Sequence, residues 1–196
     1  SASSLRACSN EFLTELRKLC TEEGIILIFD EVYTGWGKTG ELFYFMKSNV
    51  VPDIVTMSKS MGGGKASISA YTARTPLFEK AYNNLSDATL HSTTYNGFGE
   101  ECATAIEAIN IVVEDNYVAR SKEIYKRLQK GLVALQAKHP KMITAIRGAG
   151  ALNGVIINDD INPALKSAIT MIPVKLFKDK QFVSKLVTSA VISELF

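Results

Sequence analysis

An aspartate and a lysine each stand at the end of a short apolar run in this sequence. Asp30 follows IILIF, residues 25–29, and Lys59 follows DIVTM, residues 53–57, after one serine. A carboxylate and an amine placed in this way form either a structural salt bridge or the acid and the amine of a reaction centre. The glycine run at 62–64 favours the reaction centre, because backbone without side chains lets a bulky group approach closely.

The chemistry that uses both groups together is that of pyridoxal 5'-phosphate. A lysine amine bonds covalently to the aldehyde of this cofactor when its surroundings favour the neutral amine. A carboxylate beside the pyridine nitrogen keeps that nitrogen protonated, so that the ring withdraws electrons from the substrate. Asp30 and Lys59 are therefore candidates for these two roles.

The stretch GWGKTG, residues 35–40, contains the Gly-Lys-Thr of a nucleotide-binding loop but lacks its first glycine. A Walker A loop needs that glycine five places earlier, where this chain has Val32. No clear helix start follows the stretch either. We therefore interpret Lys38 as a solvated loop charge and Trp36 as a packing residue or an interface anchor. We prefer Lys59 to both Lys38 and Lys65 as the cofactor lysine, because Lys59 alone follows an apolar run and precedes the glycine run.

Strands of an α/β sheet are the elements that must position Asp30 and Lys59. Apolar residues recur at helical spacing over residues 12–20, and Gly24 ends this predicted helix. The runs at 25–29 and 53–57, and a third at 67–73, predict strands, the first of them buried in a parallel sheet. Because ligands of such sheets bind beyond the carboxyl ends of the strands, both candidates stand where a site is expected.

The later part of the chain is mainly helical before its character changes. The predicted elements are a helix over residues 75–84, a buried helix and a longer exposed helix within 100–138 with a break at 115–116, two strands around a glycine-rich turn within 142–158, and a final helix over 179–195. The strand pair has a different, α+β character. We therefore predict a change of domain at residue 116.

The composition is that of a soluble globular protein, with 46% hydrophobic and 21% charged residues among 196 and a formal net charge of +2. Charges of both signs are mixed along the chain, so we expect no nucleic-acid partner. No apolar stretch is long enough to span a bilayer, so we expect no membrane partner. Three cysteines and two histidines without metal-ligand spacing predict no metal site and reduced thiols in a cytoplasmic protein.

Four sequence blocks resemble, in order, the signature blocks of the class III pyridoxal-phosphate aminotransferases. This family includes ornithine, acetylornithine, 4-aminobutyrate and putrescine aminotransferases. The blocks are LIFDEVYTGWGKTGELF, VPDIVTMSKSMGGG, LHSTTYNGFGEECATAIEAINIV and IRGAGALNGVII. The resemblance covers residues 10–158 and implies the α/β fold type I of pyridoxal-phosphate-dependent transferases, which is aspartate aminotransferase-like. It implies that residues 1–115 are part of the cofactor-binding large domain, and that residues 116–196 are a linking helix and part of the small C-terminal domain.

The resemblance also implies roles for individual residues. Asp30 becomes the partner of the pyridinium nitrogen, and Lys59 becomes the Schiff-base lysine and the base that moves the substrate proton. Thr94, with Thr93 as the alternative, matches the threonine that binds the cofactor phosphate of the neighbouring subunit, so a homodimer is implied. Tyr33 stands where the family commonly has a glutamine that bonds the phenolic oxygen of the cofactor. Either its hydroxyl makes a similar bond or its ring turns away.

The activity implied is transfer of an amino group from a primary amine or amino acid to a keto acid or aldehyde. Members of the family are considerably longer than this chain, so we expect a fragment with little or no turnover by itself. Two alternatives stay open. One is an aminomutase or decarboxylase of the same fold, and the other is a non-catalytic segment of a larger biosynthetic protein.

Overall fold

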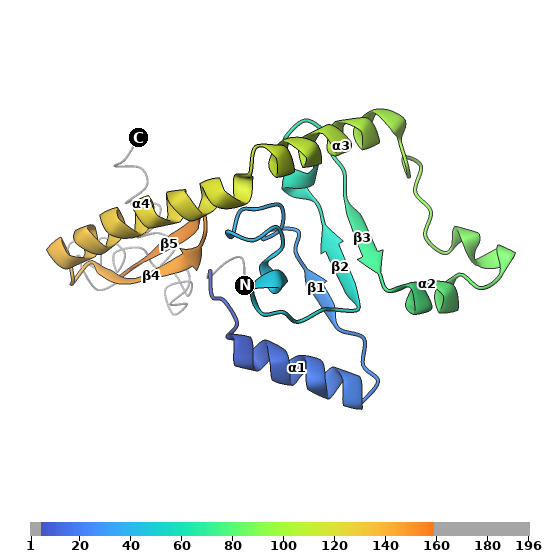
Figure 1. Cartoon of the computed structure of the whole chain (residues 1–196), viewed down its shortest axis with the longest axis horizontal. Coiled ribbons are helices and arrows are strands. Elements are labelled where there is room, and N and C mark those ends of the chain that lie inside the picture. Colours follow the sequence, from blue (N-terminus) through green and yellow to red (C-terminus); the bar gives the residue numbers. More distant parts are fainter. Residues whose placement is uncertain (1–4, 159–196) are drawn as a thin grey trace, which may run out of the picture. The chain divides into compact units, whose positions relative to one another are not determined.

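The computed structural model describes residues 5–158 (Figure 1). The chain divides into two compact units, which are described separately below. The first comprises Ser1–Lys126 and Gly148–Leu152, and the second comprises Arg127–Arg147 and Asn153–Phe196. The predicted helix over residues 179–195 lies outside the described residues.

A three-stranded sheet of order β1-β2-β3 forms the centre of the first unit (Figure 1). β1 (Ile28–Asp30) runs parallel to β2 (Ile54–Met57), and β2 runs antiparallel to β3 (Ala70–Ala73). The three predicted strands are confirmed, although each is shorter than its apolar run. β3 reverses direction because the connection from β2 contains only a short 3-10 turn, whereas a parallel return needs a longer crossover, usually a helix.

The first predicted helix is confirmed as α1 (Asn10–Glu22). The side chain of Ser9 caps its start by accepting a hydrogen bond from the Phe12 N–H at 3.2 Å. Gly24, with a φ of +64°, follows its end in the left-handed conformation that commonly stops helices. One face of the helix packs into a hydrophobic cluster whose buried members are Leu13, Cys20, Leu27 and Val50.

The prediction that residues 25–29 form a buried strand is wrong for one of the two faces. Leu27 is only 6% exposed, but Ile25, Ile26 and Ile28 are 54%, 50% and 53% exposed. Side chains of an extended chain point alternately to opposite sides, so the cluster on α1 covers Leu27 and Phe29 and leaves Ile26 and Ile28 on the other side. Ile25 lies before the strand, where its N–H still donates to the Cys20 carbonyl of α1. In the part of the chain that the structure describes, these isoleucines remain largely uncovered.

Asp53, directly before β2, joins three elements. Its Oδ2 accepts hydrogen bonds from Arg17 Nη1 of α1 at 2.7 Å and from the Leu27 N–H before β1 at 2.8 Å. Its Oδ1 accepts a hydrogen bond of 3.2 Å from Nη1 of Arg74, the residue directly before the helix Thr75–Ala81. The Asp53 side chain is only 11% exposed, so these bonds satisfy a charge that water scarcely reaches.

A second hydrophobic cluster supports the loop after β1 and the turn after β2. Its buried members are Trp36, Val55 and Met57. The indole ring of Trp36 meets the ring of Phe43 edge-on, with ring centroids 5.0 Å apart. The interpretation of Trp36 as a packing residue is therefore confirmed. A short 3-10 helix, η1 (Tyr44–Lys47), follows Phe43.

The predicted helices between residues 75 and 138 are present. They are α2 (Thr75–Ala81), the 3-10 helix η3 (Leu85–Thr89), α3 (Gly99–Glu114) and α4 (Tyr117–Lys138). The predicted break at 115–116 is confirmed, and Asn116 has a φ of +51°. The prediction that α3 is buried is wrong, because Ala105 is its one buried residue, whereas Ile106 and Val113 are 61% and 58% exposed.

The second unit contains most of the predicted strand pair. β4 (Ile143–Ala149) and β5 (Leu152–Ile157) form a two-stranded sheet around the turn at residues 150–151. Within this unit, Gln129 Nε2 of α4 donates to Asn153 Oδ1 at 2.9 Å. The two units separate between residues 126 and 127, inside α4. Assignment of the chain to a large and a small domain remains a prediction. None of the helices within residues 5–158 is long and apolar enough to cross a membrane.

Candidate active site

Asp30 and Lys59 lie at the same edge of the sheet. Asp30 ends β1 and stands opposite Thr56 of β2. Lys59 follows β2 after Ser58 and opens the 3-10 turn η2 (Lys59–Gly62). Because the two strands are parallel neighbours, their carboxyl ends point the same way, and the structure brings the two predicted residues to adjacent strand ends.

The Asp30 carboxylate is held at one oxygen and open at the other. Its Oδ1 accepts a hydrogen bond from the Val32 N–H at 2.9 Å. The residue is exposed, and its Oδ2 has no hydrogen-bond partner among residues 5–158. A carboxylate fixed in this way keeps an oxygen available for an N–H donor of a bound molecule.

Lys59 carries its amine on a strained backbone. Its φ is +49°, a left-handed conformation that costs a non-glycine residue about 1–2 kcal/mol. The side chain is exposed and makes no hydrogen bond or ion pair with any described residue. Such strain persists only where the surrounding structure fixes the backbone. One fixing contact is the hydrogen bond from Ser58 Oγ to the Ile68 carbonyl at 2.8 Å.

The glycine run after Lys59 has a structural explanation. Gly63 and Gly64 adopt φ values of +60° and +74°, which glycine reaches without steric cost. A Cβ built on Gly63 would also lie 2.9 Å from the Cβ of Ala108 in α3. The group that approaches Gly63 in the structure is therefore a helix of the same unit.

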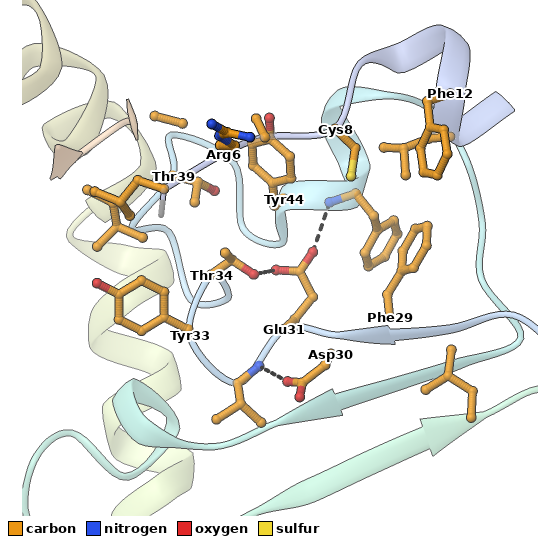
Figure 2. Close-up of a pocket in the computed structure, with 18 of the residues that line it drawn as sticks. Arg6, Cys8, Phe12, Phe29, Asp30, Glu31, Tyr33, Thr34, Thr39 and Tyr44 are labelled. Atoms are coloured by element: carbon orange, nitrogen blue, oxygen red, sulfur yellow. Dashed lines mark hydrogen bonds between the residues drawn. The ribbon is translucent and has the colours of Figure 1, made fainter. Parts of the chain in front are cut away.

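Glu31 is a buried acid that orders the loop after β1, and its role was not predicted from the sequence. It is 3% exposed, and its carboxylate accepts hydrogen bonds from the Thr34 hydroxyl and, at 2.9 Å, from the Phe45 N–H (Figure 2). Its own backbone N–H donates to the Thr56 carbonyl at 3.0 Å. These bonds explain how an acid can be buried here. Its position directly beside Asp30 was the sole sequence signal.

A cavity of about 600 Å³ lies beside β1 (Figure 2). Asp30, Tyr33 and Thr39 line it together with residues 5–8 and one face of α1. Figure 2 shows Glu31 directed toward Thr34 and the backbone of η1. Lys59 is not among the described residues that line this cavity, so Asp30 and Lys59 share a sheet edge without facing one enclosed pocket.

The interpretation of Lys38 as a solvated loop charge is wrong. Lys38 is partly buried, and its Nζ donates a hydrogen bond to Ser60 Oγ at 2.9 Å. The same Nζ lies 5.9 Å from the ring centroid of Tyr33. Burial lowers the pKa of Lys38, the charge of Lys59 lowers it further, and the charge of Glu31 opposes both effects. The loop after β1 and the turn after β2 are thus joined beside Lys59.

The two predicted phosphate ligands lie elsewhere in the first unit. Thr93 and Thr94 are exposed in the segment between η3 and α3, where the Thr93 carbonyl accepts a hydrogen bond from the Asn96 N–H at 3.1 Å. Neither threonine is joined to Asp30 or Lys59 by a hydrogen bond within the described residues. The structure therefore places Asp30 and Lys59 at adjacent strand ends and Tyr33 beside Asp30 in the lining of the cavity, and it joins neither threonine to them by a hydrogen bond within residues 5–158.

Comparisons with solved structures identify relatives of this arrangement. The ornithine aminotransferase of Toxoplasma gondii matches with 28% identity and a TM-score of 0.71, over 77% of this chain and 35% of that chain. An S-selective transaminase from Arthrobacter sp. also matches with 28% identity and a TM-score of 0.71, over 77% and 32%. An ornithine aminotransferase from Plasmodium yoelii, at 23% identity and a TM-score of 0.70 over 83% and 42%, shows likeness of fold alone.

The chain spans between about a third and two fifths of the length of these proteins. Its fold is accordingly part of fold type I of the pyridoxal-phosphate-dependent transferases. The sequence model of the aminotransferase class-III family matches residues 2–192, which is nearly the whole chain. The chain therefore belongs to the class III aminotransferase family.

Proposed function

We propose that the protein is a pyridoxal-phosphate-dependent aminotransferase that moves an amino group from a primary amine or amino acid to a keto acid or aldehyde. The observation that carries this proposal is the placement of Asp30 and Lys59 at the ends of two adjacent parallel strands. The chain belongs to the class III aminotransferases, which use pyridoxal phosphate. This cofactor gives a carboxylate and an amine a function in one reaction.

The residues present fit this cofactor. Asp30 has a free carboxylate oxygen, and the Lys59 amine has no competing partner among residues 5–158. When bound, pyridoxal phosphate supplies an aldehyde that bonds to amines and a pyridine ring that withdraws electrons from the carbon beside the amine. The donor set therefore offers one acid for the ring nitrogen and one amine for the aldehyde.

Each residue has a distinct task in the proposed reaction. Asp30 would hold the ring nitrogen of the cofactor through its free oxygen, and its negative charge would stabilise a proton on that nitrogen. Lys59 Nζ would hold the cofactor through its aldehyde carbon until a substrate amine took its place. The freed Nζ, as a neutral amine, would take a proton from the substrate carbon that bears the amine and deliver it to the former aldehyde carbon of the cofactor. We propose Tyr33 as a further cofactor contact through its hydroxyl.

The threonines point to a homodimer in this proposal. Thr94, with Thr93 as the alternative, binds the cofactor phosphate of the partner subunit. Both are exposed and bonded neither to Asp30 nor to Lys59 of their own chain within the described residues. A hydroxyl and nearby backbone N–H groups on an exposed loop suit an anion presented by a second copy.

We place the protein in the cytoplasm, with a small-molecule amine and a keto acid as its substrates. Cys8, Cys20 and Cys102 are free thiols. Free thiols suit a reducing compartment.

Borohydride trapping tests the proposed function. The full-length protein is mixed with pyridoxal phosphate, its absorbance spectrum is recorded, and the cofactor is fixed covalently by borohydride reduction. We expect the modified peptide to contain Lys59 and the Lys59→Ala variant to give no adduct at this position. An adduct that forms as readily on another lysine in the variant would disprove the assignment of Lys59.

Dependence on a keto acid separates transfer from the other reactions of this fold. With an amine donor and the cofactor, a transaminase turns over repeatedly only when pyruvate or 2-oxoglutarate is added. Sustained turnover without any keto acid would instead identify an aminomutase or a decarboxylase.

A further inference from the structure

Lys38 reaches from the loop after β1 to the residue next to Lys59. Its Nζ donates to Ser60 Oγ at 2.9 Å, and Ser60 directly follows Lys59 in η2. The ring of Tyr33 lies 5.9 Å from the same Nζ. A partly buried ammonium with these two neighbours is held in one direction, unlike a lysine that extends into solvent.

The backbone of Lys38 is also fixed. Its carbonyl accepts a hydrogen bond from the Ala151 N–H at 2.8 Å. A Cβ built on Gly150 would lie only 2.4 Å from that carbonyl oxygen, so the turn packs directly on the loop. Within the loop, the Gly40 N–H donates to the Gly37 carbonyl at 3.1 Å. Both ends of the Lys38 side chain are therefore anchored, one by backbone contacts and the other by Ser60.

Lys59 needs such external anchors. Its φ of +49° is unfavourable for lysine, and its own side chain makes no hydrogen bond within residues 5–158 that would hold it. The Ser58 Oγ bond to the Ile68 carbonyl fixes the preceding residue. The Lys38 bond to Ser60 fixes the following one.

We propose that Lys38 is a positioning residue for Lys59: through Ser60 it holds the strained turn that presents the reactive amine. The inference rests on the proposed function, because it assumes that Lys59 is the amine that bonds the cofactor. Burial and then the charge of Lys59 lower the pKa of Lys38. Lys38 itself need not touch the cofactor or the substrate.

The test compares variants of the full-length protein in their rate of bonding pyridoxal phosphate. Cofactor-free protein is mixed with pyridoxal phosphate, samples are reduced with borohydride at intervals, and the adduct on the Lys59 peptide is measured by mass spectrometry. Lys38→Met removes the donor but keeps a long side chain, and Ser60→Ala removes the acceptor. Lys38→Arg restores a charged donor. Lys65→Met changes an exposed lysine of the same segment and is the matched control.

We expect Lys38→Met and Ser60→Ala each to slow bonding about tenfold, which is the scale of one hydrogen bond to a charged group. Lys38→Arg should recover most of the rate, and Lys65→Met should behave as wild type. Because both changes break the same bond, the double variant should be no slower than Lys38→Met alone.

Several results would overturn the inference. Slow bonding in Lys38→Met together with a wild-type rate in Ser60→Ala would show that Lys38 does not act through Ser60. If the rate losses of the two single variants added up in the double variant, or if both single variants bonded the cofactor at the wild-type rate, the inference would also be wrong. A failure of the proposed function looks different, because the wild-type protein would then give no adduct on the Lys59 peptide.

Discussion

Lys59 combines the residue type that the chemistry needs with a backbone conformation that favours glycine. Its φ of +49° costs about 1–2 kcal/mol in any non-glycine residue. The chain therefore carries strain at the residue that we propose to be reactive. Strain of this kind is common at functional positions and is compensated by surrounding contacts.

This strain gives the first prediction. Lys59→Gly should raise the free energy of unfolding by about 1 kcal/mol relative to Lys59→Ala, because glycine adopts a positive φ without steric cost. Both variants lack the amine, so urea unfolding without cofactor isolates the backbone effect. At Lys65, which has no positive φ, the order should reverse, and Lys65→Gly should be less stable than Lys65→Ala. Equal stability of the two variants at position 59 would contradict the strain.

Tyr33 gives a second prediction at this scale. Its ring lines the cavity that also contains Asp30, and its hydroxyl is the group proposed to contact the cofactor. Tyr33→Phe should weaken binding of pyridoxal phosphate about tenfold through the lost hydrogen bond, and Tyr33→Gln should retain most of the affinity. Tyr44→Phe, which removes another hydroxyl from the lining of the same cavity, is the control. Binding is measured by absorbance titration, and wild-type affinity in Tyr33→Phe would mean that the ring turns away.

The sequence predicted positions that follow from the local order of residues, and it missed contacts that depend on distant partners. Asp30 and Lys59 each follow an apolar run, so their positions at strand ends follow from their immediate neighbours. Glu31 and Lys38 acquire their roles from contacts with Phe45 and Ser60. No periodicity links these partners, so spacing alone gave Lys38 the wrong surroundings.

Among the elements, α1, β1 and the start of α2 are held together by Asp53. Burial raises the pKa of Asp53, but hydrogen bonds from Arg17, Leu27 and Arg74 outweigh burial and lower the pKa overall. A carboxyl group whose pKa is lower in the folded than in the unfolded chain stabilises the fold at pH values above its unfolded pKa. That contribution is lost as the pH falls through the folded pKa.

We therefore predict a pH-dependent effect of Asp53→Asn. At pH 7 the substitution should lower the free energy of unfolding by about 2 kcal/mol, because it leaves two arginines without their partner. The difference from wild type should shrink below about pH 4, where the aspartate of the unfolded chain is itself protonated. Urea unfolding across this range measures it. Glu41→Gln removes the exposed ion pair with Lys122 and should cost at most about 1 kcal/mol. A difference that stays constant down to pH 2 would contradict the assignment.

Helices and their boundaries were predicted well where apolar residues recur at helical spacing. The exposure of side chains within an element was predicted less well. The helical repeat gave α1 and the break between α3 and α4, because spacing fixes which residues share a face. The exposed side of residues 25–29 and the exposed stripe of α3 were not predicted. The apolar type of a residue shows that its burial would be favourable. Its actual exposure depends on which other segments of the chain pack against it.

For the whole molecule, the proposed homodimer makes a prediction that only two copies can satisfy. Lys59→Ala and Thr94→Val each damage a site, but through different subunits if Thr94 serves the partner. In a mixed dimer one site carries both changes and the other carries neither. When the two inactive variants are unfolded and refolded together, activity should return to about a quarter of wild type, since half of the dimers are mixed and each has one intact site.

Two controls define this experiment. Each variant refolded alone should stay inactive, and mixing without unfolding should recover activity only as fast as subunits exchange. Mixtures that remain as inactive as their components would show that Thr94 acts within its own subunit, and an active Thr94→Val variant would show that Thr94 has no role in the site. Analytical ultracentrifugation of the wild-type protein tests the dimer itself.

The overall fold could be recognised from four blocks of sequence, but the division of the chain into compact units could not. The blocks contain characteristic residues in a characteristic order, and together they identify the family whose sequence model matches residues 2–192 of this chain. The separation between residues 126 and 127 falls inside a continuous helix. Nothing in the local sequence of a helix marks where its contacts change from one unit to another.

The close contact between Gly150 and the Lys38 carbonyl bears on how relatives of this protein can be recombined. The oxygen leaves no room for a side chain at position 150, and the next residue, Ala151, donates its N–H to the same oxygen. Segments 37–40 and 148–151 therefore have to fit each other, although more than a hundred positions separate them. A chimera whose crossover falls between them would combine a loop and a turn from different parents. Crossovers that keep both segments from one parent should give folded chimeras more often.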